Sequence, residues 1–302
     1  MTDIHFLIYC LRKLILIDLL LRKSFLKLDG WSLAVRNNSE KNMYWDVHCH
    51  ITDNRLNENI EEILAEAATK GIYGFAQGGY EPLEWQKQLE MIKRFPQYSI
   101  LPVFGLHPMW VSQAEENEIE DGLSILLRQS SNASAIGEIG LDGRKEFNQE
   151  WLKQTEAFRS QLEIAGLMKK PIVLHVVRAH SEALQQLLLH RELIHGGFVH
   201  SFTGDWDTAK QYLDLNLLIS IGGALTHPRG ESLRELVRNL PKEFFLLETD
   251  SPDQKISGWN KPIHHPVSLV NIAELVATLR NETVETILKQ NTENFRRAMN
   301  LI

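Results

Sequence analysis

The stretch SAIGEIGLDGRKEFNQEWLKQTEAFRSQLEIAGLMKKPIVLH, residues 134–175, contains the repeating unit of the fold. Its two ends, 134–140 and 171–175, are short apolar runs of the kind that form buried strands. The segment 150–170 between them has the length and composition of a helix. Two strands joined by a helix are typically parallel neighbours in one sheet.

The same unit recurs along the chain from Tyr44. Further strands are expected at 44–50, 71–78, 100–107, 197–201, 217–223 and 243–250, and further helices at 58–70, 266–279 and 282–298. Eight strands, each followed by a helix, are typical of an α/β protein with a TIM (β/α)8 barrel of about 250 residues. The alternative is an open doubly wound sheet, but the glycine-rich phosphate loops of that class do not occur. We therefore expect one barrel domain over residues 43–302.

Residues 1–42 differ from the rest, because basic residues interrupt an apolar segment at 4–28. No apolar run reaches the roughly 18 residues of a transmembrane helix, and no secretory cleavage motif is present. Three interpretations stay open: an amphipathic helix on a membrane surface, a packing or dimerising helix, and a mis-assigned start with translation from Met43. We expect an N-terminal helical extension that need not belong to the natural protein.

The composition limits the class of protein. Two cysteines are too few for a disulfide framework or a cysteine-based zinc module, and they fit a reducing, cytoplasmic location. Outside residues 1–42 the chain has 25 Lys and Arg against 35 Asp and Glu, which argues against a broad grip on duplex DNA. A pocket lined by metal ions can still bind phosphate, because bound cations reverse the local charge.

Polar side chains gather where the expected strands end. Five histidines and two carboxylates close apolar runs at their C-terminal ends, namely His48, His50, His107, Glu138, His175, His200 and Asp250. In a barrel these ends meet on the rim that carries the chemistry.

His48 and His50 are two residues apart on one strand, so their side chains point to the same face, about 7 Å apart. Such a pair can converge on one metal ion, while Cys49 between them faces the packing side. Imidazole and carboxylate ligands suit Zn, Mn, Fe or Co, and carboxylates also suit Mg. An isolated H-x-H is as easily two ordinary rim histidines, and the further ligands at other strand ends favour the metal.

Glu138 and Asp250 follow apolar runs, and a buried carboxylate is costly unless it is paired or bound to a cation. For Glu138 the competing partner is Arg144. Glu248 shares the face of Asp250, and we favour Asp250 as the ligand because it lies closer to the rim.

Six motifs in order resemble the TatD family of metal-dependent hydrolases: D-V-H-C-H (46–50), G-L-H-P (105–108), G-E-I-G-L-D (137–142), V-L-H-V-V-R-A-H (173–180), V-H-S-F-T-G (199–204) and L-E-T-D-S-P (247–252). The resemblance covers roughly residues 44–300. It implies a TIM barrel with a one- or two-metal centre and Mg- or Mn-dependent nuclease activity. It further implies that a first metal is held by His48, His50 and Asp250, a second by His175 and His200, and that Glu138 bridges the two. It places His107 against the substrate.

The chain departs from the family pattern around the expected substrate pocket. Asp53 comes one residue late for H-x-H-x-D, Val177 replaces the arginine of H-x-R with Arg178 following, and His264-His265-Pro266 replaces Asn-x-Pro. The six metal ligands are unaffected. We expect His107, Arg178 and Arg229 to bind substrate, the arginines at phosphate oxygens. The alternative for each arginine is a solvated or salt-bridged position on the rim.

The ligand set predicts a hydrolase that uses a metal-bound hydroxide, because two cations about 3.5–4 Å apart lower the pKa of water from 15.7 to roughly 7. We expect Asp250 and Glu138 to be catalytic, with Asp250 as the general base. The cofactors would be two divalent ions (Mg, Mn or Zn). The expected activity is a phosphodiesterase of deoxyribonuclease type, acting on single-stranded nucleic acid or a small phosphoester.

Two other functions stay open. One is an amidohydrolase-like lactonase or amidase, whose sites often carry a carboxylated lysine where Glu138 stands here. The other is a non-catalytic metal-binding scaffold, which the complete ligand set disfavours.

Overall fold

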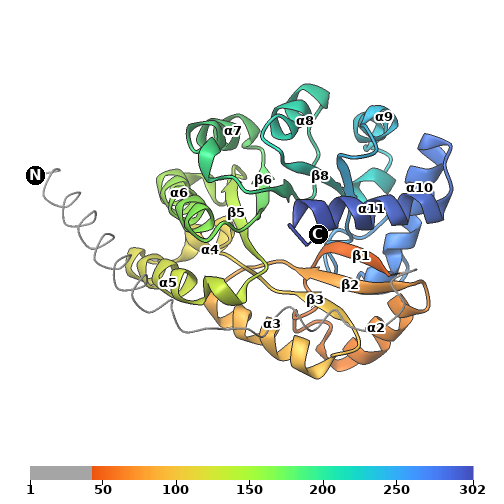
Figure 1. Ribbon diagram of the computed structural model, residues 1–302, viewed down its shortest axis with the longest axis horizontal. Helices are drawn as coiled ribbons and strands as arrows, with labels where there is room; N and C mark the ends of the chain where they lie inside the picture. Colours follow the sequence, from red (N-terminus) through yellow and green to blue (C-terminus); the bar gives the residue numbers. More distant parts are fainter. Residues whose placement is uncertain (1–42, 302) are drawn as a thin grey trace, which may run out of the picture. The chain divides into compact units, whose positions relative to one another are not determined.

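The computed structural model describes residues 43–301, in which parallel strands are surrounded by helices (Figure 1). The extension expected over 1–42 lies outside the described residues. The strands are β1 (Tyr44–Cys49), β2 (Ile72–Gln77), β3 (Ser99–Leu101), β4 (Val103–Phe104), β5 (Ala135–Asp142), β6 (Ile172–Val177), β7 (Gly197–Val199), β8 (Leu218–Ile221) and β9 (Phe245–Leu247). The helices are α2 (Ile60–Ala68), α3 (Pro82–Arg94), α4 (Pro108–Gln113), α5 (Glu116–Gln129), α6 (Trp151–Met168), α7 (His180–Leu189), α8 (Trp206–Leu213), α9 (Glu231–Asn239), α10 (Leu269–Arg280) and α11 (Val284–Ala298).

The strands pair in chain order as β1-β2-β3 and β4-β5-β6-β7-β8-β9, and each pair is parallel. The single strand expected over 100–107 is two short ones, because Pro102 stands between β3 and β4 and lacks the N–H that a ladder needs. The Pro102 carbonyl still accepts from Ser134 N at 2.7 Å. The two short strands therefore fill one of eight strand positions.

The first and last strand positions are joined just beyond β9. Asp250 N donates to His48 O at 3.0 Å, and His50 N donates to Ser251 O at 2.7 Å. The strand expected over 243–250 is shorter than predicted, because Asp250 has φ 52° and lies in a turn. Eight consecutive strand positions whose ends are linked in this way form the (β/α)8 arrangement that the sequence predicts.

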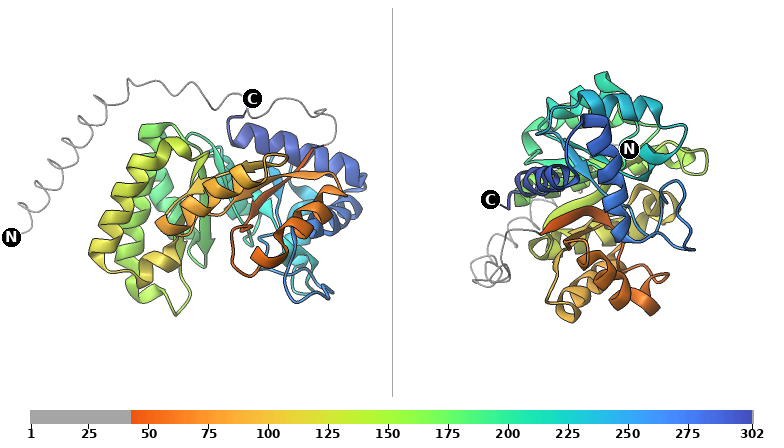
Figure 2. Two further views of the ribbon diagram at one scale, coloured as in Figure 1. Left: turned by 90° about the horizontal axis from the view of Figure 1, so that it is seen from below. Right: turned by 90° about the vertical axis from the view of Figure 1, so that its right-hand side faces the viewer.

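Helix α11 packs across one end of the strands, against β1 and β9 (Figure 2). Its Phe295 is fully buried and lies 5.1 Å from Trp45 and 6.2 Å from Phe198, measured between ring centroids. These contacts fill the N-terminal end of the strands, so the polar site is confined to the opposite end. Within residues 43–301 no helix combines the length and apolar character needed to cross a bilayer.

Candidate metal centre

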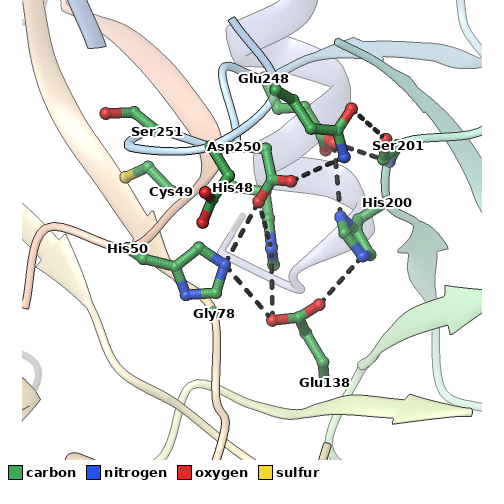
Figure 3. Close-up of polar contacts among 12 residues, drawn as sticks. His48, Cys49, His50, Gly78, Glu138, His200, Ser201, Glu248, Asp250 and Ser251 are labelled. Carbon is green, nitrogen blue, oxygen red and sulfur yellow. Dashed lines mark hydrogen bonds and ion pairs between the residues drawn. The ribbon is translucent and has the colours of Figure 1, made fainter. Parts of the chain in front are cut away.

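The alternation of β1 places His48 and His50 as the sequence predicts. His48 is fully buried, and the two imidazole centroids lie 5.2 Å apart, edge to face. Cys49 points into the apolar core, where its Sγ lies 3.5 Å from Ala76 O. Both imidazoles therefore face one space at the C-terminal end of the strands (Figure 3).

Glu138 on β5 lies at the centre of five imidazoles, as Figure 3 shows for three of them. Its Oε1 is 3.5 Å from His48 Nε2 and 3.6 Å from His50 Nε2. Its Oε2 lies within 3.5 Å of nitrogens on the three other strand-end histidines, His107, His175 and His200. Gly78 leaves room for this arrangement, because a Cβ there would lie 2.2 Å from His50 Cε1 and 2.6 Å from Glu138 Oε1.

Asp250 completes the first half of the site. Its Oδ1 lies 3.2 Å from His50 Nε2 and 3.6 Å from His48 Nε2. Its Oδ2 accepts a 2.7 Å hydrogen bond from Gln254 Nε2, which fixes the carboxylate. Glu248, the alternative left open by the strand pattern, turns away to Ser220 and Ser201 N and lies 3.5 Å from His200 Nδ1. The geometry therefore favours Asp250 as the ligand. Glu248 instead lies beside His200 and helps to orient that ring.

Hydrogen bonds decide which nitrogen each histidine offers. The Nε2–H group of His175 donates to Asp142 Oδ2 at 3.1 Å. The other ring nitrogen, Nδ1, therefore carries the lone pair of the neutral ring and lies on the side of Glu138. In His107, Nδ1 accepts from Met109 N at 3.1 Å, so the ring proton of the neutral form sits on Nε2 and points at the cluster. His175 is thus set up as a ligand, and His107 as a hydrogen-bond donor.

The residues fit divalent cations. Three groups each offer ligand atoms within 4.8 Å of one another: His48, Glu138 and His200; His48, His50 and Asp250; His107, Glu138 and His175. Both ring nitrogens of His48, Oε1 of Glu138 and Nδ1 of His200 are buried without a hydrogen-bond partner in residues 43–301. A buried polar atom without a partner is costly, and a cation at the centre would satisfy these atoms.

The carboxylates and imidazoles shift one another's pKa values. Burial lowers the pKa of His50, but the Asp250 hydrogen bond and the charges of Glu138 and Asp250 outweigh it and raise the pKa to about 10. Burial opposes ionisation of Asp250, yet the His50 hydrogen bond and the neighbouring imidazoles lower its pKa to about 2. Burial together with His175 lowers the pKa of His107 to about 4, so this ring is neutral at pH 7.

A cavity of about 1040 Å³ opens over the cluster. Among the residues that line it, six carboxylates stand against three Lys or Arg side chains, Arg55, Lys87 and Arg144. Arg178 and Arg229, which the sequence predicts to bind substrate, do not line this cavity, and both are exposed. Arg178 comes one residue after Val177, which lines the cavity, and its backbone is left-handed, with φ 52°. Arg229 lies beyond the 3-10 helix Gly223–Thr226.

Three residues that orient the candidate ligands were not identified from the sequence. They are Asp142 beside His175, Glu248 beside His200, and Gln254 beside Asp250. Asp142 could have been found, since Glu138, Gly140 and Asp142 follow the period of two along β5. Arg144, the suggested partner of Glu138, instead binds Asp142. Gln254 has no such signal, because it lies in a loop.

The matching family model, described as TatD related DNase, covers residues 45–300. The chain belongs to the TatD family. An "Uncharacterized metal-dependent hydrolase" of Haemophilus influenzae is 28% identical over 256 residues, which are 83% of this chain and 97% of that protein. The "3'-5' ssDNA/RNA exonuclease TatD" of Edwardsiella piscicida is 32% identical over 259 residues, 84% of this chain and 98% of that protein.

The crystal structure of the TatD homologue YjjV from Escherichia coli superposes with a TM-score of 0.77 at 26% identity. It covers 85% of this chain and 98% of that one. The TIM-barrel prediction and the predicted divalent-metal cofactors are thereby confirmed, and the chain is a metal-dependent hydrolase of the TatD family.

Proposed function

We propose that this TatD-family chain is a phosphodiesterase that hydrolyses single-stranded nucleic acid or a small phosphodiester. The observation that carries the proposal is the sharing of ligands: His48 and Glu138 each belong to two of the three ligand groups. Shared ligands allow two cations to sit side by side, an arrangement that suits displacement at phosphorus. The exonuclease name of the Edwardsiella relative supports the same substrate class.

His48, His50 and Asp250 would hold one cation, His175 and His200 the other, and Glu138 would bridge them. Divalent cations bound there polarise a phosphoryl oxygen and lower the pKa of water.

The chain's own residues contribute proton transfer and orientation. Asp250 accepts the proton of the attacking water, because its lowered pKa keeps it ionised and Gln254 holds its other oxygen. The neutral His107 donates its Nε2–H to a substrate oxygen, since Met109 N occupies Nδ1. The buried Asp142 keeps Nδ1 of His175 turned toward the cluster.

The charge around the cavity limits the substrate. Six lining carboxylates against three Lys or Arg side chains make the empty cavity acidic, so an anionic substrate needs the cations to bind. A long duplex would find little positive surface outside the cavity, given the formal net charge of −7. A short or single-stranded substrate that places one phosphodiester in the cavity suits this distribution. We propose the cytoplasm as the place of action.

The test is a substrate panel on purified protein with Mg, Mn or Zn. It holds bis(4-nitrophenyl) phosphate, a nitrophenyl monoester, labelled single-stranded and duplex DNA, a carboxyl ester, a lactone and an amide. We expect diester and single-strand cleavage that chelator abolishes, with duplex cleaved at least about tenfold more slowly. Turnover of the lactone or amide alone would replace the proposal by the amidohydrolase alternative. Full metal content without any turnover would favour a metal-binding scaffold.

Variants place the activity in the cluster. His50→Ala removes a ligand of the first cation and is expected to lower turnover about 10³-fold, a loss of the size that a displaced catalytic metal causes. The matched control is His227→Ala, which removes an exposed histidine that lies outside the cavity lining. Normal turnover by His50→Ala would remove the first cation from the mechanism.

A further inference from the structure

Three basic side chains line the cavity, and of these Arg144 combines a fixed position with hydrogen-bond donors that have no partner in the described part of the chain. The Nε, Nη1 and Nη2 groups of Arg55 are all occupied by Asp53 and Asp253. Lys87 is exposed and makes no polar contact with another residue in the range 43–301, so nothing fixes its ammonium group. Arg55 is thus neutralised by two carboxylates, and Lys87 is unrestrained.

The guanidinium of Arg144 is held through Nε and Nη2, and Nη2 also donates to Met109 Sδ at 3.1 Å. Its Nε lies 2.9 and 3.0 Å from the two oxygens of Asp142, and its Nη2 donates to Asp142 Oδ2 at 2.5 Å. The guanidinium also lies over the Phe147 ring, 5.1 Å from the centroid. Within the described residues the two N–H groups of Nη1 have no partner, and 37% of the side chain is exposed.

Asp142 links this arginine to the metal cluster. The carboxylate is completely buried, and its Oδ2 accepts from both Arg144 Nη2 and His175 Nε2. The guanidinium is therefore separated from the cluster by one carboxylate and one imidazole. The two N–H groups of Nη1 suit a phosphate oxygen, because the contacts of Nε and Nη2 set the orientation of the guanidinium before the ligand arrives.

We propose that Arg144 binds the anionic phosphate group of the substrate or product, and that Asp142 positions both Arg144 and His175. This deepens the proposed phosphodiesterase function and rests on it for the class of ligand. Arg144 takes the role that the sequence had assigned to Arg178 and Arg229. Asp142 is a positioning residue, since it is buried, its carboxylate is bonded to Arg144 and His175, and its backbone is bonded to the Gln154 side chain.

The test is binding rather than turnover. Calorimetric titration of the Mn²⁺-loaded protein with inorganic phosphate and with thymidine 5′-monophosphate gives the dissociation constants. We expect Arg144→Met to weaken both by about 10- to 100-fold, as for the loss of a charged hydrogen bond. Bound manganese, measured on the same samples, is expected to stay at the wild-type level. Arg144→Lys keeps the positive charge but lacks the planar guanidinium. We expect its dissociation constants to lie between those of the wild type and of Arg144→Met.

Arg178→Met is the matched control, because it removes an exposed arginine outside the cavity lining. It is expected to bind both probes like the wild type. The inference is overturned if Arg144→Met keeps wild-type affinity, if Lys87→Met alone loses it, or if a loss of manganese accounts for the whole change.

Asp142→Asn tests the positioning role. The amide has no negative charge, and its NH2 group replaces one of the two oxygens that accept from Arg144 and His175, so we expect weaker phosphate binding together with lower manganese content. Wild-type values for both would overturn that part.

The outcomes also separate the two proposals. Phosphate binding that depends on Arg144, without diester turnover, would remove the proposed function alone. Wild-type protein that binds neither probe would overturn both.

Discussion

The Oε2 atom of Glu138 lies 2.9 Å from the Nε2 atom of His200, the shortest histidine–carboxylate distance in the described site (Figure 3). Glu138 lies within β5 and His200 directly follows β7, and these two strands are not neighbours in the sheet. Their approach shows that the strand ends converge on one point above the barrel. Because Glu138 lies close to the proposed ligands of both cations, the proposed two-metal arrangement depends on this residue.

Replacing Glu138 by glutamine keeps the shape of the side chain and removes its charge. We expect Glu138→Gln to hold at most one divalent ion per chain and to cleave bis(4-nitrophenyl) phosphate at least about 10³-fold more slowly, as for loss of a catalytic metal. Metal analysis and steady-state kinetics measure both effects. Glu81→Gln is the control, because Glu81 lines the cavity but belongs to none of the ligand groups. Two ions bound to Glu138→Gln would contradict the bridging role.

Gly78 gives a second way to disturb the cluster without removing a ligand. The added Cβ of Gly78→Ala would meet His50 and Glu138 at 2.2 and 2.6 Å, so both side chains must shift. We expect metal content and turnover to fall by more than about tenfold while the circular dichroism spectrum is unchanged, since misplaced ligands lose affinity steeply. In Gly122→Ala, on α5, the Cβ meets the end of the Leu106 side chain at 3.0 Å and the Trp110 ring at 3.5 Å, neither of which is a candidate ligand, and metal content should be retained. Full occupancy in Gly78→Ala would show that the ligands lie elsewhere.

Metal binding is expected to release protons at neutral pH. The pKa of His50 is raised to about 10, so its ring carries a proton at pH 7 when no cation is bound, and the pKa of His200 is raised, despite its burial, by the charge of Glu138. A cation needs the neutral ring, so binding must expel this proton, and affinity must rise as pH increases toward about 10. Calorimetry in two buffers of different ionisation enthalpy counts the protons. A count of zero at pH 7 would contradict this description of the cluster.

The join between the first and last strands is expected to carry stability. Asp46 is fully buried and accepts from Thr249 N at 2.9 Å and from Thr249 Oγ1 at 2.5 Å. Asp46→Ala leaves both donors buried without a partner, which should lower the free energy of unfolding by about 2–4 kcal/mol. Thr249→Val removes the hydroxyl but keeps the N–H bond, and should cost about 1 kcal/mol. Urea unfolding measures both, and an Asp46→Ala midpoint equal to the wild type would refute the role of this join.

Much of this architecture could be predicted from the sequence because barrel strands are short, apolar and buried on both faces. The run of β5 and β6 around α6 is of this kind. The candidate ligand cluster could be predicted from the same pattern, since His48 and His50 obey the period of two and the other candidates lie in or just after the apolar runs of their own strands. The sequence could not show that Pro102 divides one strand or that Asp250 lies in a turn, because both depend on local backbone geometry.

The position of each arginine relative to the cavity could not be predicted from the sequence, because it depends on the backbone of the loops. Arg178 is one residue away from an inward position, and the left-handed backbone there sends it outside the cavity lining. Arg144 comes two residues after Asp142, and only the folded chain shows that the pair leads back to His175. His264 shows the same limit: nothing in H-H-P reveals that this ring is fully buried and bonded to Ser268 Oγ.

Anomalous diffraction from crystals loaded with Mn²⁺ tests the central claim most directly. The account predicts two peaks with Glu138 bonded to both, one also bonded to His48, His50 and Asp250, and the other to His175 and His200. Peaks bonded to other residues, or no peak among these six at saturating Mn²⁺, would contradict it.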